Sequence, residues 1–534
     1  MADCKSLQAC SSGCPVPVAL LFSRFLTQPS RARSSSVRRS PSLARRRSLM
    51  AMFRSRADTK KEEINEKEVQ QGVYPGQDVE EVAAQDRLRP EVADAFALRD
   101  GDEGHNLNYK NLGWIKAGII ITCEAVALGT LSFPSTFRRL GMAGGLICNT
   151  AFIVIAYLSA WIMVDFKQRY PHVLNAADAG EVLFGRWGYR IVGAAIVFKS
   201  LGLAASHILA GKLAIATFDS GTNCAIGWAV LIAGVSAVLS YNRRWSGLLG
   251  LSVASITCIV IACIITMVGA GTQDPARLEV NNVPVHWVAF NTEVTLADAV
   301  GAITNCVFAY GQNMAVLTFL PEMRKPKDFR KSIALMQGFQ LVVYSIVGGV
   351  LYSYGGQYTP SPALTMTEHK LAIASYAFAL VTIIVSGIVA VNVGAKFFYT
   401  QLFRNSALLT SNSWTAQWAW LAIIFSMYGI AFVVAELIPF FNQLLTIVSC
   451  LTSTWFVCGF AGMLWLHMNS PRSATEYNTG GWFSSPVRVA LFLISVILIL
   501  MSCAITPLGI YSAVKGIIDG YSNGKFDHPF SCSS

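Results

Sequence analysis

Long apolar segments constrain this chain more than any other feature of its sequence. From Gly113 onward, runs of about 20 apolar residues recur, which is the length an α-helix needs to cross roughly 30 Å of hydrocarbon. Because a bilayer interior satisfies no backbone polar group, each run is expected to be helical. We therefore expect an all-α membrane protein with eleven transmembrane helices. Their approximate ranges are Gly113–Pro134, Met142–Phe166, Tyr189–Phe218, Cys224–Tyr241, Gly247–Gly269, Leu296–Leu320, Ser332–Tyr354, Leu371–Phe397, Gln417–Leu437, Phe440–His467 and Val487–Val514.

The composition supports a membrane location and excludes several other classes of protein. Of the 534 residues, 53% are hydrophobic and 14% charged, whereas soluble proteins have about 25% charged residues. The stretch from Met1 to Arg56 carries most of the net charge of +11, so no basic nucleic-acid-binding face is expected. The 13 cysteines lie mostly inside apolar runs without paired spacing, which predicts neither a zinc site nor a disulfide framework. No phosphate-binding loop or metal-binding motif is present, so we expect no enzyme, cofactor or metal.

The apolar runs divide the chain into three regions. Residues 1–112, rich in Ser and Arg up to Arg56, are expected to be disordered and cytosolic. Residues 113–518 form the transmembrane domain, and residues 519–534 a short non-cytosolic tail. Two alternatives stay open for the leader: a mitochondrial presequence, or a true start at Met50 or Met52.

Cations in the short loops predict the orientation, because cytosolic loops carry an excess of Lys and Arg. With the amino terminus inside, the outer loops hold only Arg138, Arg139, Arg277 and Lys370. This distribution predicts a cytosolic amino terminus and a carboxyl terminus outside. The inner loops hold Lys167, Arg169, Arg186, Arg190, Arg243, Arg244, Arg324, Lys325, Lys327, Arg330, Lys331, Lys396, Arg404, Arg472 and Arg488.

Two runs, five spans apart, show signs of helix interruption. The first has Gly129 and Thr130 at mid-span and ends at Pro134, and the sixth has Gly311 among polar residues. Such paired breaks are typical of transporters, in which exposed backbone groups at the midplane bind substrate and ions. The alternative is close packing, for which glycine is common in membrane helices. The breaks predict a site formed by Ala125, Val126, Ala127, Leu128, Gly129, Thr130, Phe308, Tyr310, Gly311, Gln312 and Asn313.

The first of these segments resembles a known family. Residues 127–141 are similar to the first-helix signature Gly-x-Gly-x-Leu-x-x-Pro-x-x-Phe-x-x-x-Gly of the amino acid/auxin permease family, with Ala127 in place of its first glycine. Residues 175–185, residues 308–313 and Pro321-Glu322-Met323 also resemble that family, within a similarity covering about Leu112 to Ile518. The fungal neutral amino acid permeases of the methyltryptophan-resistance type are the most similar branch.

The resemblance implies a LeuT-like fold of five plus five helices in an inverted repeat, with one extra helix. It implies proton-coupled uptake of neutral aliphatic and aromatic amino acids across the plasma membrane by alternating access. By analogy with that fold, Ser206, Ser386 and Asn392 are further candidates for substrate binding, although each can instead bond a neighbouring helix. Phe308 and Tyr310 are either an aromatic gate or ordinary packing residues.

Ionisable residues inside the spans are functional candidates, because a charge at that depth is costly. Glu124 in the first span, and Lys199 and His207 in the third, are our candidates for proton coupling. The structural alternatives are a permanent pair between Glu124 and Lys199, and a packing role for His207. Asp298 and Glu436 lie near span ends and are expected to be interfacial.

Other functions remain open at this stage. A vacuolar exporter of the same family would share every motif, and a substrate-sensing transceptor would share the fold. A channel should show a continuous polar stripe on several helices, and these spans show local breaks instead. The exact substrate, Na⁺ rather than H⁺ coupling, and the oligomeric state do not follow from the sequence.

Overall fold

The structure is a computed structural model. It describes residues 110–219, 223–274, 278–279, 283–403, 406–409, 411–438, 440–477, 480–522, 530 and 532. Nearly all of the predicted disordered region 1–112 therefore lies outside the described residues, as do Arg277, Arg404 and Pro439.

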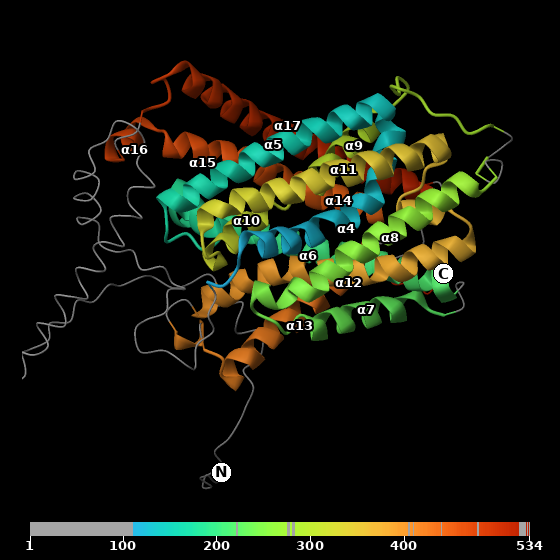
Figure 1. Ribbon diagram of the computed structural model, residues 1–534, viewed down its shortest axis with the longest axis horizontal. Coiled ribbons are helices and arrows are strands. Elements are labelled where there is room, and N and C mark those ends of the chain that lie inside the picture. The colour runs from blue at the N-terminus through green and yellow to red at the C-terminus, as the bar shows by residue number, and fades with distance from the viewer. Residues whose placement is uncertain are drawn as a thin grey trace, which may run out of the picture. The chain divides into compact units, whose positions relative to one another are not determined.

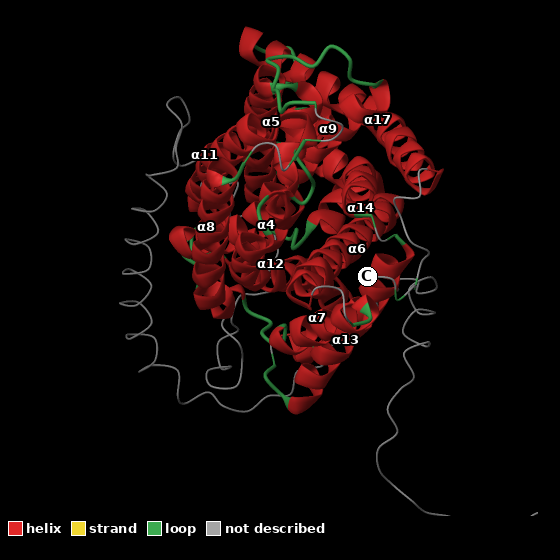
Figure 2. Ribbon diagram, turned by 90° about the vertical axis from the view of Figure 1, so that its right-hand side faces the viewer, coloured by secondary structure: helices red, strands yellow, loops and turns green. Residues whose placement is uncertain are grey.

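The described part of the chain is helical, apart from loops and one isolated bridge between Leu112 and Met323 (Figure 2). Within it, nine segments are long and apolar enough to cross a bilayer, α7 is shorter, and the sixth predicted run is divided between α9 and α10. The all-α membrane fold is thus confirmed, while the number of eleven spans stays a prediction. The main helices are α4 (Trp114–Leu140), α5 (Met142–Arg169), α6 (Ala176–Asp219), α7 (Ala225–Leu239), α8 (Leu249–Thr272), α9 (Leu296–Ala309), α10 (Asn313–Phe319), α11 (Phe329–Gly355), α12 (His369–Phe403), α13 (Trp414–Leu437), α14 (Phe441–Val448), α15 (Phe460–Met468), α16 (Pro471–Glu476) and α17 (Pro486–Ser522).

Helix α4 is the central helix of the described bundle. It packs against α8, α9, α11 and α12, and Figure 1 shows it enclosed by its neighbours. Its most apolar stretch is 94% buried inside the protein, whereas the corresponding stretch of α17 is 17% buried. The residues of α4 can therefore form an interior site, while α17 offers most of its surface to lipid.

The predicted break in the first span is wrong. Helix α4 runs without interruption from Trp114 to Leu140 and contains Pro134. Pro134 has no N–H, so the carbonyl of Thr130 lacks its usual helical donor, yet the helix continues through it. Ala127 stands where the family usually has glycine, and the Thr130 hydroxyl bonds back to the carbonyl of Val126. Alanine favours helical backbone more than glycine does, and the Thr130 hydroxyl bonds within the helix without interrupting it.

The sixth span is broken where the sequence predicts. Helix α9 ends at Ala309, residues Tyr310 to Gln312 form a turn, and α10 begins at Asn313. A Cβ atom on Gly311 would lie 2.7 Å from Ser453 Oγ and 2.9 Å from Lys199 Nζ. Only glycine fits this crowded turn without displacing its neighbours.

Helix α6 begins with a short cap, which gives a structural role to the polar residues at the start of the stretch from Asn175 to Gly185. Asn175 Oδ1 accepts bonds from the backbone N–H groups of Ala177 and Asp178, and Asp178 accepts one from Leu174. These side-chain bonds satisfy the free donors at a helix start. Gly185, with φ of +63°, then kinks the helix in a conformation that favours glycine.

The carboxyl-terminal region differs from the prediction in two ways. Helix α17 continues to Ser522, beyond the predicted domain boundary at residue 518. Cys224, just before α7, forms a disulfide with Cys532, so the expectation of no disulfide is wrong. Their separation of 308 residues hides the pairing, because no short Cys spacing marks it.

Candidate functional site

A small cavity lies where the broken span meets α4 and α6. We call it the central cavity. Its volume of about 10 Å³ has room for about one water molecule, so an amino acid requires the surrounding helices to move apart. Nine of its ten lining residues are among the predicted site residues. The lining residues are Glu124, Ala125, Leu128 and Gly129 from α4, Lys199, Leu203 and His207 from α6, and Phe308, Gly311 and Gln312 from the broken span.

The Lys199 side chain joins α6 to the break between α9 and α10. Its Nζ donates to the main-chain carbonyl of Gly311, and the side chain is 2% exposed. The turn at Tyr310 to Gln312 frees backbone groups that an unbroken helix would use internally. The ammonium group therefore satisfies a carbonyl that the break leaves available.

Glu124 and His207 add two further ionisable groups to the same cavity. Both are buried, and neither Oε2 of Glu124 nor Nδ1 of His207 has a hydrogen-bond partner in the structure. Glu124 and Lys199 do not form the direct ion pair that we considered from the sequence, because Lys199 bonds Gly311 instead. A buried carboxylate without a direct cationic partner is well suited to take up a proton.

The remaining predicted residues are buried but do not line the central cavity. Ser206 donates to the carbonyl of Gly202, and Asn392 to that of Ile388, each within its own helix. Others bond between helices: Ser386 to the Cys123 carbonyl at 2.7 Å, Asn313 to the Ala156 carbonyl at 3.0 Å, and Tyr310 to the Asn149 side chain. Val126, Ala127 and Thr130 are packed in the core of α4.

Sequence reasoning missed a clamp from α11. Tyr344 donates to the Ala125 carbonyl at 2.6 Å, and Gln340 donates to the Ala309 carbonyl at 2.8 Å. These side chains, four residues apart on one helical face, join α4 to the end of α9. Two polar residues four positions apart within an apolar span are a sequence pattern that could have identified this clamp. Leu203, the tenth lining residue, carries no such signal.

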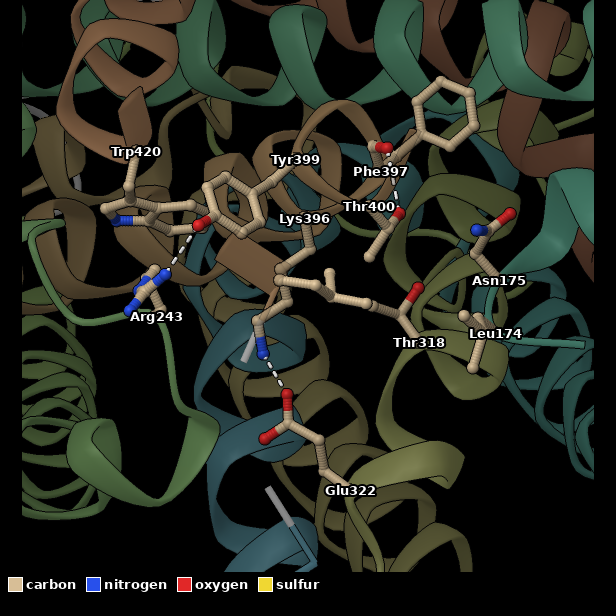
Figure 3. Close-up of a pocket in the computed structure, with 11 residues that line it drawn as sticks. Leu174, Asn175, Arg243, Thr318, Glu322, Lys396, Phe397, Tyr399, Thr400 and Trp420 are labelled. Carbon is tan, nitrogen blue, oxygen red and sulfur yellow. Dashed lines mark hydrogen bonds and ion pairs between the residues drawn. The ribbon is translucent and has the colours of Figure 1, made fainter. Parts of the chain in front are cut away.

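The end of the bundle predicted to face the cytosol is closed by a buried ion pair (Figure 3). Lys396 of α12 pairs with Glu322, which follows α10, and its Nζ lies 3.8 Å from the centroid of the Trp245 ring. Glu322 also accepts a bond from the Trp245 backbone N–H. The cavity beside this pair has a volume of only about 30 Å³. Burial raises the pKa of Glu322, and the Lys396 ammonium opposes that rise.

This closed end is tied together by the backbone as well. The N–H of Leu112, just before α4, donates to the carbonyl of Glu322, and the N–H of Arg324 donates to the carbonyl of Leu112. These two bonds join the start of α4 to the segment that follows α10.

A larger cavity lies at the opposite end of the bundle. We call it the outer cavity; its volume is about 470 Å³, within the range of small-molecule sites. Arg138 and Arg139 of α4, Asp298 of α9 and Phe440 beside α14 are among its lining residues. Asp298 is 54% exposed, whereas Glu436, which was also expected at an interface, is 2% exposed and pairs with Lys212 at 2.9 Å.

These features define a polytopic helical membrane protein with an interior cavity at a helix break. One end of its bundle is closed by an ion pair, and the other end contains a larger cavity. Residues 110–508 match the family model described as transmembrane amino acid transporter protein. The chain belongs to this family, and the family resemblance predicted from the sequence is confirmed.

Individual relatives agree with this family. The chain is 29% identical to an N amino acid transport system protein of Neurospora crassa, over 81% of this chain and 91% of that one. It is 23% identical to a transmembrane transporter of Gibberella moniliformis, over 80% and 88% of the two chains. Among solved structures, a Na⁺-coupled sialic acid symporter aligns with 76% of this chain and 90% of its own, at 12% identity and a TM-score of 0.43.

Proposed function

We propose that this amino acid transporter moves neutral aliphatic and aromatic L-amino acids together with protons, by alternating access across the plasma membrane. The amino terminus would be cytosolic and the carboxyl terminus outside. The observation that carries the proposal is the central cavity, in which Glu124, Lys199 and His207 meet the backbone of a broken helix. The name of the Neurospora relative, an N amino acid transport system protein, supports the substrate class.

The lining of the central cavity suits a neutral substrate. Backbone groups at the Gly311 turn can bind the charged ends of an amino acid, since free N–H and C=O groups at helix ends attract opposite charges. Leu128, Leu203 and Phe308 offer an apolar surface for the side chain. A cationic substrate would meet Lys199 in the same small volume and be repelled.

Glu124 is the proposed proton carrier. Its carboxylate is buried in the cavity and not directly paired with Lys199. When the outer end is open, a proton bound to Glu124 removes the cost of burying its charge as the helices close around the substrate. Release of that proton on the other side completes the coupling.

The test is uptake of labelled leucine and phenylalanine by cells expressing the chain, at about pH 5 and about pH 7.5. This range spans the ordinary pKa of histidine and lies above that of an ordinary carboxyl group. We expect acid-stimulated uptake that a protonophore abolishes. Glu124→Gln should retain surface expression and lose the acid stimulation, whereas Glu293→Gln, in an exposed loop, should behave as wild type.

Three outcomes would redirect the proposal. Uptake that ignores pH but requires Na⁺ removes proton coupling and leaves the substrate class. Protein on internal membranes without surface uptake favours the vacuolar exporter. Substrate binding and downstream signalling without accumulation of label favours the transceptor.

A further inference from the structure

The outer cavity lies beyond the central cavity along the same three helices. On α6, Leu203 and His207 line the central cavity and Ala210 and Leu213 line the outer one. At 1.5 Å per residue, Leu203 and Ala210 are about 10 Å apart along the helix axis.

Helices α4 and α9 repeat this order. On α4, Gly129 lines the central cavity and Arg138 the outer one; on α9, Phe308 and Asp298 do the same. The outer cavity therefore lies along the route from this end of the three helices to the central cavity.

Two arginines give the outer cavity a cationic wall with unused hydrogen-bonding capacity. Arg139 is 15% exposed, and its Nε is buried without a hydrogen-bond partner. Arg138 donates one bond, from Nη1 to the Thr359 carbonyl at 2.9 Å. A guanidinium group matches a carboxylate in geometry, so the two arginines that line the cavity can bind the carboxylate of an amino acid.

Two carboxylates, Asp298 and Asp519, line the same cavity as these cations. Asp298 Oδ1 is 3.9 Å from Arg139 Nε, which is a loose contact, while Asp298 Oδ2 accepts a bond from Thr295 Oγ1 at 2.8 Å. The Thr295 bond holds the carboxylate at the start of α9, facing solvent. Leu209, Leu213, Phe440 and Phe441 supply apolar surface in the same cavity.

We propose that the outer cavity is a separate binding site for a zwitterionic amino acid with an apolar side chain, which occupies it before entering the central cavity. Arg139 and Arg138 bind the carboxylate, Asp298 binds the ammonium group, and the apolar wall receives the side chain. This inference rests on the proposed function for its ligand class. It also accounts for Arg138 and Arg139, a cationic pair on the side where loop cations are otherwise few.

The test measures occupancy of the outer cavity without requiring transport. Gln443→Cys places a thiol in the cavity wall, and the full-length protein in membranes is treated with a membrane-impermeant maleimide. Labelling above the wild-type background is followed with increasing leucine. We expect leucine to slow labelling of Gln443→Cys and not of Glu293→Cys, which lies in an exposed loop.

Charge variants in the Gln443→Cys background test the assigned contacts. Arg139→Gln and Asp298→Asn should each raise the half-protecting leucine concentration about tenfold, the loss expected for one charge-assisted hydrogen bond. Lys370→Gln and Glu293→Gln, charges at exposed positions outside the cavity, should leave it unchanged. The amine 3-methylbutylamine and the acid 4-methylpentanoate, each with one of the two charges of leucine, should protect poorly.

Failure of this site is distinguishable from failure of the proposed function. Equal protection in Arg139→Gln and wild type, or equal protection by the single-charge analogues, overturns the outer site even if uptake is normal. Protection with the predicted charge dependence supports the site even in Glu124→Gln, which lacks proton coupling. Size-exclusion profiles of the detergent-solubilised variants identify any that fail to fold. If Arg139→Gln fails to fold, Arg139→Lys serves as the second variant at this position.

Discussion

The ammonium group of Lys199 donates a hydrogen bond to the main-chain carbonyl of Gly311, more than a hundred residues away in sequence. This bond holds a charge of α6 against the turn that separates α9 from α10. It links the only broken span in the described part of the chain to α6, one of the three helices that line both cavities.

Removal of the Lys199 charge should disable transport more than it unfolds the protein. Lys199→Gln leaves a donor but shortens the side chain, so the Gly311 carbonyl loses its partner. We expect uptake to fall about tenfold or more, with the remaining uptake showing a shifted pH dependence, as when a positioned charge is lost. Lys515→Gln on α17 is the matched control. Unchanged uptake and pH profile in Lys199→Gln would refute this role.

Gly129 should not tolerate a side chain. A Cβ atom there would clash with the Tyr344 hydroxyl, which bonds the Ala125 carbonyl. Gly129→Ala should lower the free energy of unfolding by about 1–3 kcal/mol, the usual range for overpacking a tight core. Gly227→Ala on α7 has open space around the new methyl group and should be neutral or slightly stabilising. Thermal unfolding of the two purified variants gives the comparison, and equal melting temperatures would contradict it.

The Glu322–Lys396 pair should behave as a unit. The two side chains are 3% and 11% exposed, so Glu322→Gln or Lys396→Met alone leaves a buried charge without its partner, at a cost of about 3–5 kcal/mol. The double variant should recover much of that loss. A double-mutant cycle of melting temperatures measures the coupling, and additive effects would show that the pair does not act together.

The same pair has a defined pH dependence. Burial raises the pKa of Glu322, because a charged carboxylate is costly to bury. This free-energy cost is present at neutral pH and disappears as the pH falls through the raised pKa, since the carboxyl group then becomes neutral. A carboxyl whose pKa is raised by burial binds its proton more tightly when buried than when exposed, so acidification should favour the closed end. In wild type, maleimide labelling of Thr400→Cys, in the adjoining cavity, should fall with acid, and Glu322→Gln should remove that dependence.

The disulfide predicts which side of the membrane the carboxyl terminus occupies. Disulfides persist in oxidising compartments, so Cys224 and Cys532 should face outside. In Cys532→Ser, the freed Cys224 should react with an impermeant maleimide on intact cells, and wild type should react only after an impermeant reductant. Labelling that requires permeabilised cells would place these residues on the other side, or the protein on internal membranes.

The fold was predictable because the strongest signal in the sequence, the recurring apolar runs, follows directly from the properties of the bilayer. Apolar runs of bilayer length admit only helices, and the boundaries of most runs agree with the structure within a few residues. The break at Gly311 was also predictable, since the structure shows a turn that only glycine fits. The break at Gly129 was not present: helix α4 continues through Ala127, Gly129 and Thr130.

The site was predicted in part for similar reasons. Glu124, Lys199 and His207 are conspicuous in apolar spans, and the structure gathers them around one cavity. Their partners were not predictable, because the choice between Glu124 and Gly311 as acceptor for Lys199 depends on helix packing. Ser386 and Asn392 show the same limit, as hydroxyl and amide side chains find carbonyls wherever packing brings them close.

The bond between Cys224 and Cys532 also closes every element from α7 to α17 into a covalent ring. A protease that cuts any one loop within this ring opens it without separating the pieces, because both ends remain joined through sulfur. Nicked protein should thus migrate as one species until it is reduced. The helices that contribute the broken span and the closed end would stay attached to one another after such damage.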